Sequence, residues 1–195
     1  MKQVEHKHSN KLLWMSTAIF AVEYLAIIGY NWLLGGHLGD ASLTISRFVG
    51  LNIWSIAIFC ILNIAICVLV VCHLVANAGS KSFVWRFLMY GFVIAFMALS
   101  ISPHLQDEGI SSDIHKFFAG TMFVIMALVG ILTMATTKKR WLLVFGTLFV
   151  IYGIFFIVCD LMRVDFFMNN ILWFESAYLF AFFGLLLGSS REEVA

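Results

Sequence analysis

Charged residues and proline are scarce in this chain. Of its 195 residues, 12% are charged and one is proline, whereas 62% are hydrophobic. An ordinary soluble domain has about 25% charged and about 45–50% apolar residues. The composition therefore excludes a soluble enzyme fold, a disordered tail and a disulfide scaffold, and it predicts a chain that lies in a bilayer. The net charge of +1 gives no basic face for nucleic acid, which is bound by clustered Lys and Arg.

Short motifs of soluble enzymes are also lacking. The four cysteines form no Cys-x-x-Cys, and there is no Gly-x-Ser-x-Gly, so neither a redox motif nor a serine-hydrolase motif is present. Haem binding needs histidines at matching depth in neighbouring helices, whereas His73 and His115 lie at opposite ends of their hydrophobic segments. We expect no cofactor.

What the chain does have is long hydrophobic segments. A helix needs about 20 mainly apolar residues to cross the hydrocarbon core of a bilayer. Six segments of this kind fill most of the sequence, approximately at 12–34, 52–77, 83–101, 113–136, 141–163 and 170–189. No room remains for a soluble domain. The sequence therefore predicts a single all-α integral-membrane domain over 1–195, a bundle of six transmembrane helices.

The basic residues predict the orientation of this bundle. With a cytoplasmic N-terminus, nine of the 12 Lys and Arg fall on the cytoplasmic side, and the other three, Arg47, Lys116 and Arg163, lie outside. Because short cytoplasmic loops carry an excess of Lys and Arg, both termini are predicted to be cytoplasmic. The expected location is the plasma membrane, as a multi-pass protein of a bacterial inner membrane.

Ionisable side chains inside the predicted spans point to function. Each costs about 2.5–3.5 kcal/mol at the bilayer centre on insertion scales, so it needs a partner or a water-filled cavity. Most of them lie in the outer half of the spans or at its rim: Glu23, Arg47, His115, Asp160, Arg163 and Glu175. This asymmetry predicts an outward-facing polar pocket, which with Asn63 and Ser55 of the second span could bind a lipid head group or a small ligand.

Simpler explanations exist for some of these residues. Asp160 and Arg163 are three residues apart and could pair on one helix face. His115 could be an interfacial residue at a helix N-terminus, where Asp113 is well placed as N-cap. Glu23 lacks a basic residue three or four positions away, as does the glutamate of the last span, so a functional or buried-network role is favoured for both.

Two other chemistries use the same residues. A proton- or ion-coupled transporter or channel could load and release protons on Glu23 and Glu175. A membrane-embedded metal-dependent hydrolase would need three converging ligands, for which His104, His115 and a nearby acid are weak candidates because their spacing matches no zinc signature. Whether the protein is an enzyme stays open.

Three short segments resemble those of a known family. They are Thr-Ile-Ser-Arg-Phe-Val-Gly at 44–50, Asp-Ile-His at 113–115 and Trp-Phe-Glu at 173–175. Together with the six-span layout, they make the chain similar to the Frag1/DRAM/Sfk1-like superfamily, in particular to its bacterial branch of unknown function. Arg47, His115 and Glu175 match that pattern, whereas Glu23 has no counterpart in it.

The resemblance implies a membrane protein linked to lipid handling, because eukaryotic members act in the remodelling of lipid anchors and in autophagy regulation. It implies no established catalytic residue. Membrane lipids are the expected partners, with a homo-oligomer or a larger membrane complex as further possibilities.

Overall fold

The computed structural model describes residues 2–35, 45, 49, 53–78, 81–101 and 110–190, and within them the chain is helical without any strand. Seven helices occur in these residues: α1 (Lys2–Gly35), α3 (Ile53–Ala76), α4 (Phe83–Ile101), α5 (Ile110–Thr136), α6 (Arg140–Leu161), α7 (Asp165–Met168) and α8 (Ile171–Ser190). The predicted all-α class is confirmed.

Among the described residues, five helices are long and apolar enough to cross a membrane: α3, α4, Asp113–Thr136 of α5, α6 and α8. The chain is an integral multi-pass membrane protein. The first predicted span, 12–34, lies within α1, whose 34 residues extend over about 50 Å at 1.5 Å per residue. This length exceeds the hydrocarbon core of about 30 Å.

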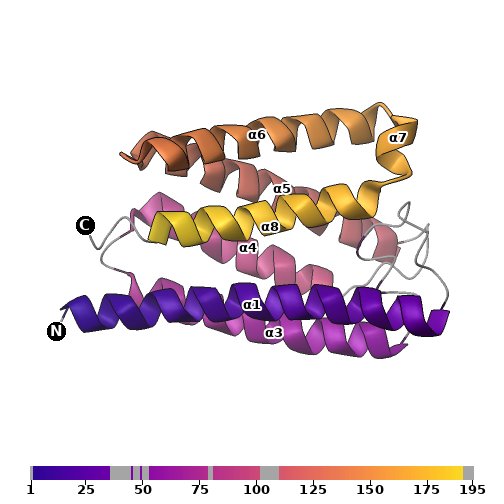
Figure 1. Ribbon diagram of the computed structural model, residues 1–195, viewed down its shortest axis with the longest axis horizontal. Coiled ribbons are helices and arrows are strands. Elements are labelled where there is room, and N and C mark those ends of the chain that lie inside the picture. The colour runs from indigo at the N-terminus through magenta and orange to yellow at the C-terminus, as the bar shows by residue number, and fades with distance from the viewer. Residues whose placement is uncertain are drawn as a thin grey trace.

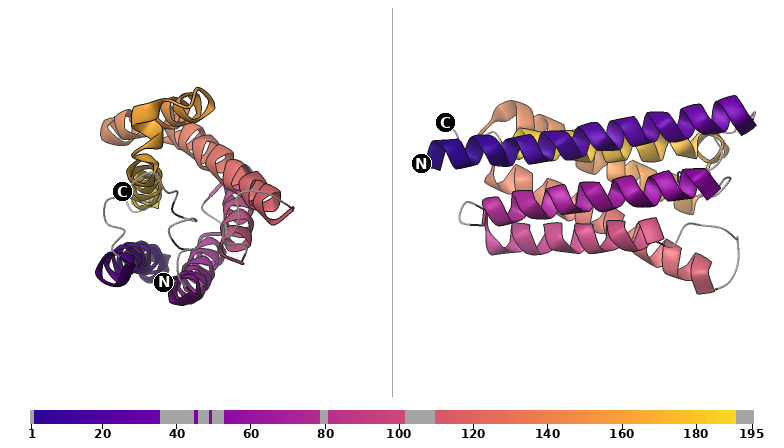
Figure 2. Two further views of the ribbon diagram at one scale, coloured as in Figure 1. Left: turned by 90° about the vertical axis from the view of Figure 1, so that its right-hand side faces the viewer. Right: turned by 90° about the horizontal axis from the view of Figure 1, so that it is seen from below.

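The long helices form a closed ring (Figures 1 and 2). Along the ring, α1 packs against α3, α3 against α4, α4 against α5, and α5 against α6. The last helix, α8, contacts α6, α5 and α1, and so joins the end of the chain to its beginning. Both chain ends lie at the same end of the bundle (Figure 1), which we call the terminal end; the other is the far end.

The core is centred on α8 and is largely aromatic. Tyr178 is 1% exposed and stacks on Phe149 of α6 and Phe123 of α5, with ring centroids 4.5 and 5.3 Å away. On the other side of α8, Phe183 stacks on Phe20 of α1 at 5.0 Å. Aromatic pairs of this kind contribute about 0.5–1.5 kcal/mol beyond their buried area. They hold α8 against α6, α5 and α1.

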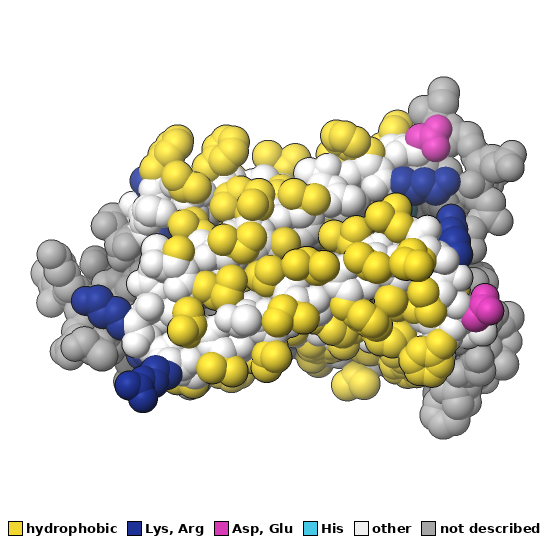
Figure 3. Space-filling model, turned by 90° about the horizontal axis from the view of Figure 1, so that it is seen from above, with side chains coloured by type: hydrophobic (Ala, Val, Ile, Leu, Met, Phe, Trp, Pro, Cys, Tyr) yellow, Lys and Arg dark blue, Asp and Glu magenta, His cyan; other side chains and the backbone are white. Residues whose placement is uncertain are grey.

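The outer surface suits contact with lipid. Large apolar side chains such as Ile131, Leu148 and Ile154 are about half exposed. Figure 3 shows a band of hydrophobic side chains on one face, with charged residues confined to its two ends. The band and the charged ends correspond to the hydrocarbon core and the two interfaces of a bilayer.

The fifth predicted span ends earlier than expected. It was predicted to reach residue 163, but α6 ends at Leu161. Arg163 adopts φ 51°, and the N–H of Val164 bonds the carbonyl of Cys159 at 3.1 Å. This is a Schellman motif, in which a left-handed residue terminates the helix. The chain then turns through α7 into α8.

Glycines on α6 allow α5 and α8 to approach closely. A Cβ at Gly153 would lie 2.5 Å from the hydroxyl oxygen of Tyr178, and one at Gly146 would lie 2.7 Å from Met134 of α5. By contrast, a Cβ at Gly120 of α5 would meet nothing within 4 Å. The glycines of α6 therefore serve packing inside the bundle.

We predict that Gly153→Ala lowers the free energy of unfolding by about 1–3 kcal/mol, because the new methyl group would displace the stacked Tyr178 ring. The matched variant Gly120→Ala should be neutral or stabilising by up to about 1 kcal/mol, because alanine favours helix at an unobstructed site. Denaturant unfolding in detergent micelles, followed by tryptophan fluorescence, measures both. Equal effects of the two variants would contradict the packing role of Gly153.

Candidate functional site

Two buried polar side chains face the middle of the bundle. Glu23 of α1 is 2% exposed and Asn63 of α3 is 0% exposed. Neither the carboxylate oxygens of Glu23 nor the amide atoms of Asn63 have a hydrogen-bond partner among the described residues. Asn63 lies within two residues of the midpoint of α3, or about 2 Å along the helix axis. Buried polar groups are nearly always hydrogen-bonded, so an unsatisfied pair needs an explanation.

The surroundings of Glu23 place it against α3. Its carboxylate interacts electrostatically with the thiols of Cys60 and Cys67. Asn63 lies three residues after Cys60 and four before Cys67, which puts all three on one helix face. Both thiols are hydrogen-bonded to carbonyls of α4, that of Cys60 to Ser100 at 2.8 Å. Where α1 meets this face of α3, the unsatisfied groups are therefore the carboxyl of Glu23 and the amide of Asn63.

A pair of hydroxyl groups connects α1 to α8 next to this site. The hydroxyls of Tyr24 and Ser176 are hydrogen-bonded, and Ser176 also bonds the carbonyl of Leu172. The Tyr24 ring packs edge-on against Phe180, with centroids 5.5 Å apart. Since Tyr24 follows Glu23 directly, this contact fixes the part of α1 that carries the buried carboxyl.

Toward the far end, Glu175 continues the polar region. Its carboxylate accepts a hydrogen bond from the backbone N–H of Ile45 at 2.7 Å, and it interacts electrostatically with Asp160 and with Tyr24. Asp160 and Glu175 are both partly buried. The structure thus brings three of the predicted residues into one region, with Glu23 at mid-depth and the two other acids nearer the far end.

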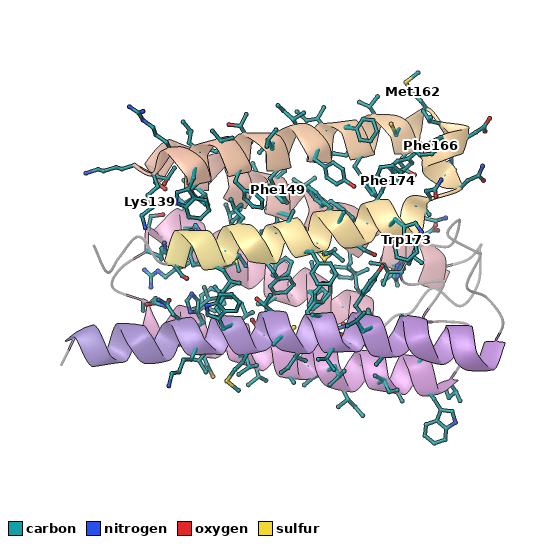
Figure 4. The ribbon with its side chains drawn as sticks, viewed as in Figure 1. Lys139, Phe149, Met162, Phe166, Trp173 and Phe174 are labelled. Carbon is teal, nitrogen blue, oxygen red and sulfur yellow. The ribbon has the colours of Figure 1, made fainter. Side chains whose placement is uncertain are left out.

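Arg163 does not form the ion pair with Asp160 that was the simpler explanation for both residues. The helix ends at Leu161, so the helical spacing that would bring the two side chains together is lost at Arg163, which is exposed. Within the described residues no ion pair involves Arg163. The corner that follows is aromatic: Phe174 stacks on Phe167 at 4.9 Å, and Met162 points away from the bundle (Figure 4).

The other predicted site residues lie elsewhere. His115 is 7% exposed near the start of α5, which packs against α4, α6 and α8, so it belongs to a different wall of the ring from Glu23. Arg47 and His104 lie outside the described residues. Within the described residues, no group of three or more His, Cys, Asp or Glu side chains is placed to hold a metal ion.

Sequence reasoning missed the hydroxyl pair and the backbone donor of Ile45. Tyr24 and Ser176 each follow a glutamate that the sequence singled out, and this adjacency was the available signal. The contact itself joins residues 152 positions apart. The contact between Tyr24 and Ser176 becomes visible only in the folded bundle, where α1 and α8 are neighbours.

Similarity to known proteins was tested in three ways. No family model, no curated protein and no solved structure matches this chain. The resemblance to the Frag1/DRAM/Sfk1-like superfamily stays a prediction.

We predict that removing the unsatisfied polar groups stabilises the protein. Asn63→Leu and Glu23→Met replace them with apolar side chains of similar size, and each should raise the free energy of unfolding by about 1–3 kcal/mol, the typical cost of an unsatisfied buried group. Ser176→Ala removes hydrogen-bonded oxygen and should lower it. Thermal unfolding in detergent micelles compares the three. Destabilisation by Asn63→Leu would show that the amide has a partner in the folded protein.

We also predict that Arg163→Gly stabilises the helix end. An L-residue in the left-handed region costs about 1–2 kcal/mol, which glycine avoids at an entropic cost of about 0.5–1 kcal/mol. The net gain in unfolding free energy should be roughly 0.5–1 kcal/mol. Met162→Gly, at the right-handed C-cap, should instead destabilise. A loss of stability in Arg163→Gly would mean that the arginine side chain itself stabilises the far end.

Proposed function

We propose that this protein is a small proton transporter whose proton-binding group is Glu23. One observation supports this function above the others: a carboxyl group at mid-depth in the bundle, 2% exposed, without a hydrogen-bond partner among the described residues. A buried, ionised and unpaired carboxylate costs several kcal/mol. Taking up a proton, or pairing with a cation, removes this cost. The charge of Glu23 therefore depends on what enters the site.

Asn63 complements such a group. Its amide provides two donors and a carbonyl acceptor, and none of them is used within the described residues. The amide nitrogen suits the ionised carboxylate, whereas the amide oxygen suits the protonated one. The same neighbour can thus stabilise Glu23 both before and after proton transfer.

The arrangement also offers a route from the far end. Asp160 and Glu175 interact electrostatically, Glu175 interacts with Tyr24, and Tyr24 shares a hydrogen bond with Ser176. Hydroxyl groups both donate and accept hydrogen bonds, so we propose that the Tyr24–Ser176 pair lies on the proton path, with water completing the path to Glu23, whose carboxyl bonds neither hydroxyl. In this proposal Asp160 and Glu175 collect the proton and Glu23 holds it.

The proposal includes the predicted topology. We infer that α1 also spans the membrane, which brings the number of spans to six. We further infer that the terminal end is cytoplasmic because of its Lys and Arg excess, and that the membrane is a bacterial plasma membrane. Both chain ends lie at one end of the bundle, which supports an even number of spans. The far end then faces outward, as the predicted outward-facing pocket requires.

A second candidate is the binding of a lipid head group at the far end. The electrostatic contact between the partly buried carboxylates of Asp160 and Glu175 favours a cationic group over a phosphate. This candidate fits the lipid handling that the superfamily resemblance implies. It predicts that Glu175→Gln weakens retention of an amine-bearing lipid, measured by mass spectrometry of the purified protein, whereas Glu23→Gln does not.

Proton entry into liposomes tests the proposed proton transporter. Protein reconstituted with an entrapped pH-sensitive dye should acidify the lumen when a potassium diffusion potential is imposed with valinomycin. Glu23→Gln keeps the shape of the side chain and should reduce the initial rate at least tenfold, because the amide cannot carry the proton. Asp113→Asn, an exposed acid at the start of α5, is the matched control and should match wild type. Equal rates for wild type and Glu23→Gln, or no proton entry with wild type, would rule the proposal out.

A further inference from the structure

A second polar cluster lies at the terminal end, separate from the proposed proton site. Lys81 and Arg86 flank Trp85 where the chain enters α4. The Lys81 ammonium lies 5.3 Å from the centroid of the Trp85 ring and donates a hydrogen bond to the carbonyl of Ser189 at 3.2 Å. That carbonyl belongs to the last turn of α8, the negative end of the helix dipole. The lysine is thereby held at the junction of α4 and α8.

Arg86 brings an unused donor to this junction. Its Nε atom is buried and has no acceptor among the described residues. The guanidinium is permanently charged and presents a planar fork of donors. An unsatisfied buried donor on a charged group is costly, so the position favours an acceptor supplied from outside the described chain.

The neighbouring end of α3 is polar as well. His73 and Asn77 are 2% and 4% exposed, and the Asn77 amide donates to the carbonyl of His73 at 2.9 Å. His73 lies three residues before the end of α3, and Arg86 lies three residues after the start of α4. Because the two helices are consecutive and packed together, these residues lie at similar depth.

Negative side chains are absent from this end among those the structure describes. Asp113, Asp160, Asp165 and Glu175 are toward the far end, and Glu23 is at mid-depth. The charges drawn at the terminal end in Figure 3 are likewise basic. Among the described side chains, the charges next to the junction of α3, α4 and α8 are therefore those of Lys81 and the partly buried Arg86, and both are positive.

We propose that Lys81 and Arg86 bind a phosphate group at the terminal end of the bundle. Arginine matches phosphate oxygens with two parallel hydrogen bonds, lysine adds a second positive charge, and basic pockets between transmembrane helices on the cytoplasmic side are suited to anionic head groups. A phosphate at this depth belongs either to a phospholipid of the adjoining leaflet or to a free phosphate ester. The site does not depend on proton transport, since it shares no residue with the Glu23 region.

Binding to delipidated protein tests the site. Purified protein in detergent is titrated with phosphatidylglycerol, with diacylglycerol as the lipid that lacks phosphate, and with glycerol phosphate as the water-soluble ester. Bound molecules are counted by native mass spectrometry. Wild type should bind one phosphatidylglycerol more tightly than diacylglycerol. Arg86→Gln should weaken that binding about tenfold to a hundredfold, as expected for loss of hydrogen bonds to a charged group.

Arg140→Gln is the matched control, because Arg140 is an exposed arginine at the start of α6 and its loss should leave binding unchanged. Lys81→Gln provides a second variant that should weaken binding even if Arg86→Gln does not fold. Competition by glycerol phosphate would assign the site to a free ester, and its absence would assign the site to the lipid. Equal binding of phosphatidylglycerol and diacylglycerol, or equal losses in Arg86→Gln and Arg140→Gln, would overturn the proposal.

Discussion

The hydrogen bond between Tyr24 and Ser176 closes the ring of helices. Most neighbouring long helices in the ring follow one another in the chain. The pair α6 and α8 is separated only by the short α7. The contact of α1 with α8 joins the two ends of the sequence. It combines two hydroxyls with the rings of Phe20, Phe180 and Phe183. Since Glu23 precedes Tyr24 and Glu175 precedes Ser176, the same contact sets the distance between the two glutamates.

Hydropathy was sufficient to predict most of the helices. The third predicted span coincides with α4 at 83–101, and the second, fourth and sixth differ from their helices by at most three residues at either end. The length of an apolar segment matches the thickness of the hydrocarbon core. The helix itself can continue into the membrane–water interface, because its backbone hydrogen bonds persist there. This difference explains why α1 begins at Lys2, ten residues before the predicted span. The left-handed Arg163 gave no hydropathy signal, so the end of α6 and the turn of α7 could not be predicted.

The candidate site was predictable only in part, because its key feature is a missing contact. The absence of a basic residue three or four positions from Glu23 is visible in the sequence, and the structure agrees that the carboxyl is unpartnered within the described residues. Asn63 was expected to contribute to the pocket, but the sequence does not show that its amide has no partner, since a polar residue in a span usually bonds a neighbouring helix. The alternative pairing of Asp160 with Arg163 assumed a continuous helix. It fails where the helix ends.

In the proposed transporter, exposing Glu23 to either side of the membrane requires that one of its neighbouring helices move. The interface of α1 with α3 runs along most of both helices and is the most extensive in the bundle, so separating these two would expose much apolar surface. The seam between α1 and α8 is narrower. There, one hydroxyl pair and a few ring contacts hold the helices together, and α8 keeps its stacking on Phe149 and the α6 glycines when the seam opens. Of these two interfaces of α1, the seam with α8 therefore opens at the lower cost, and Tyr24, which holds that seam, directly follows Glu23.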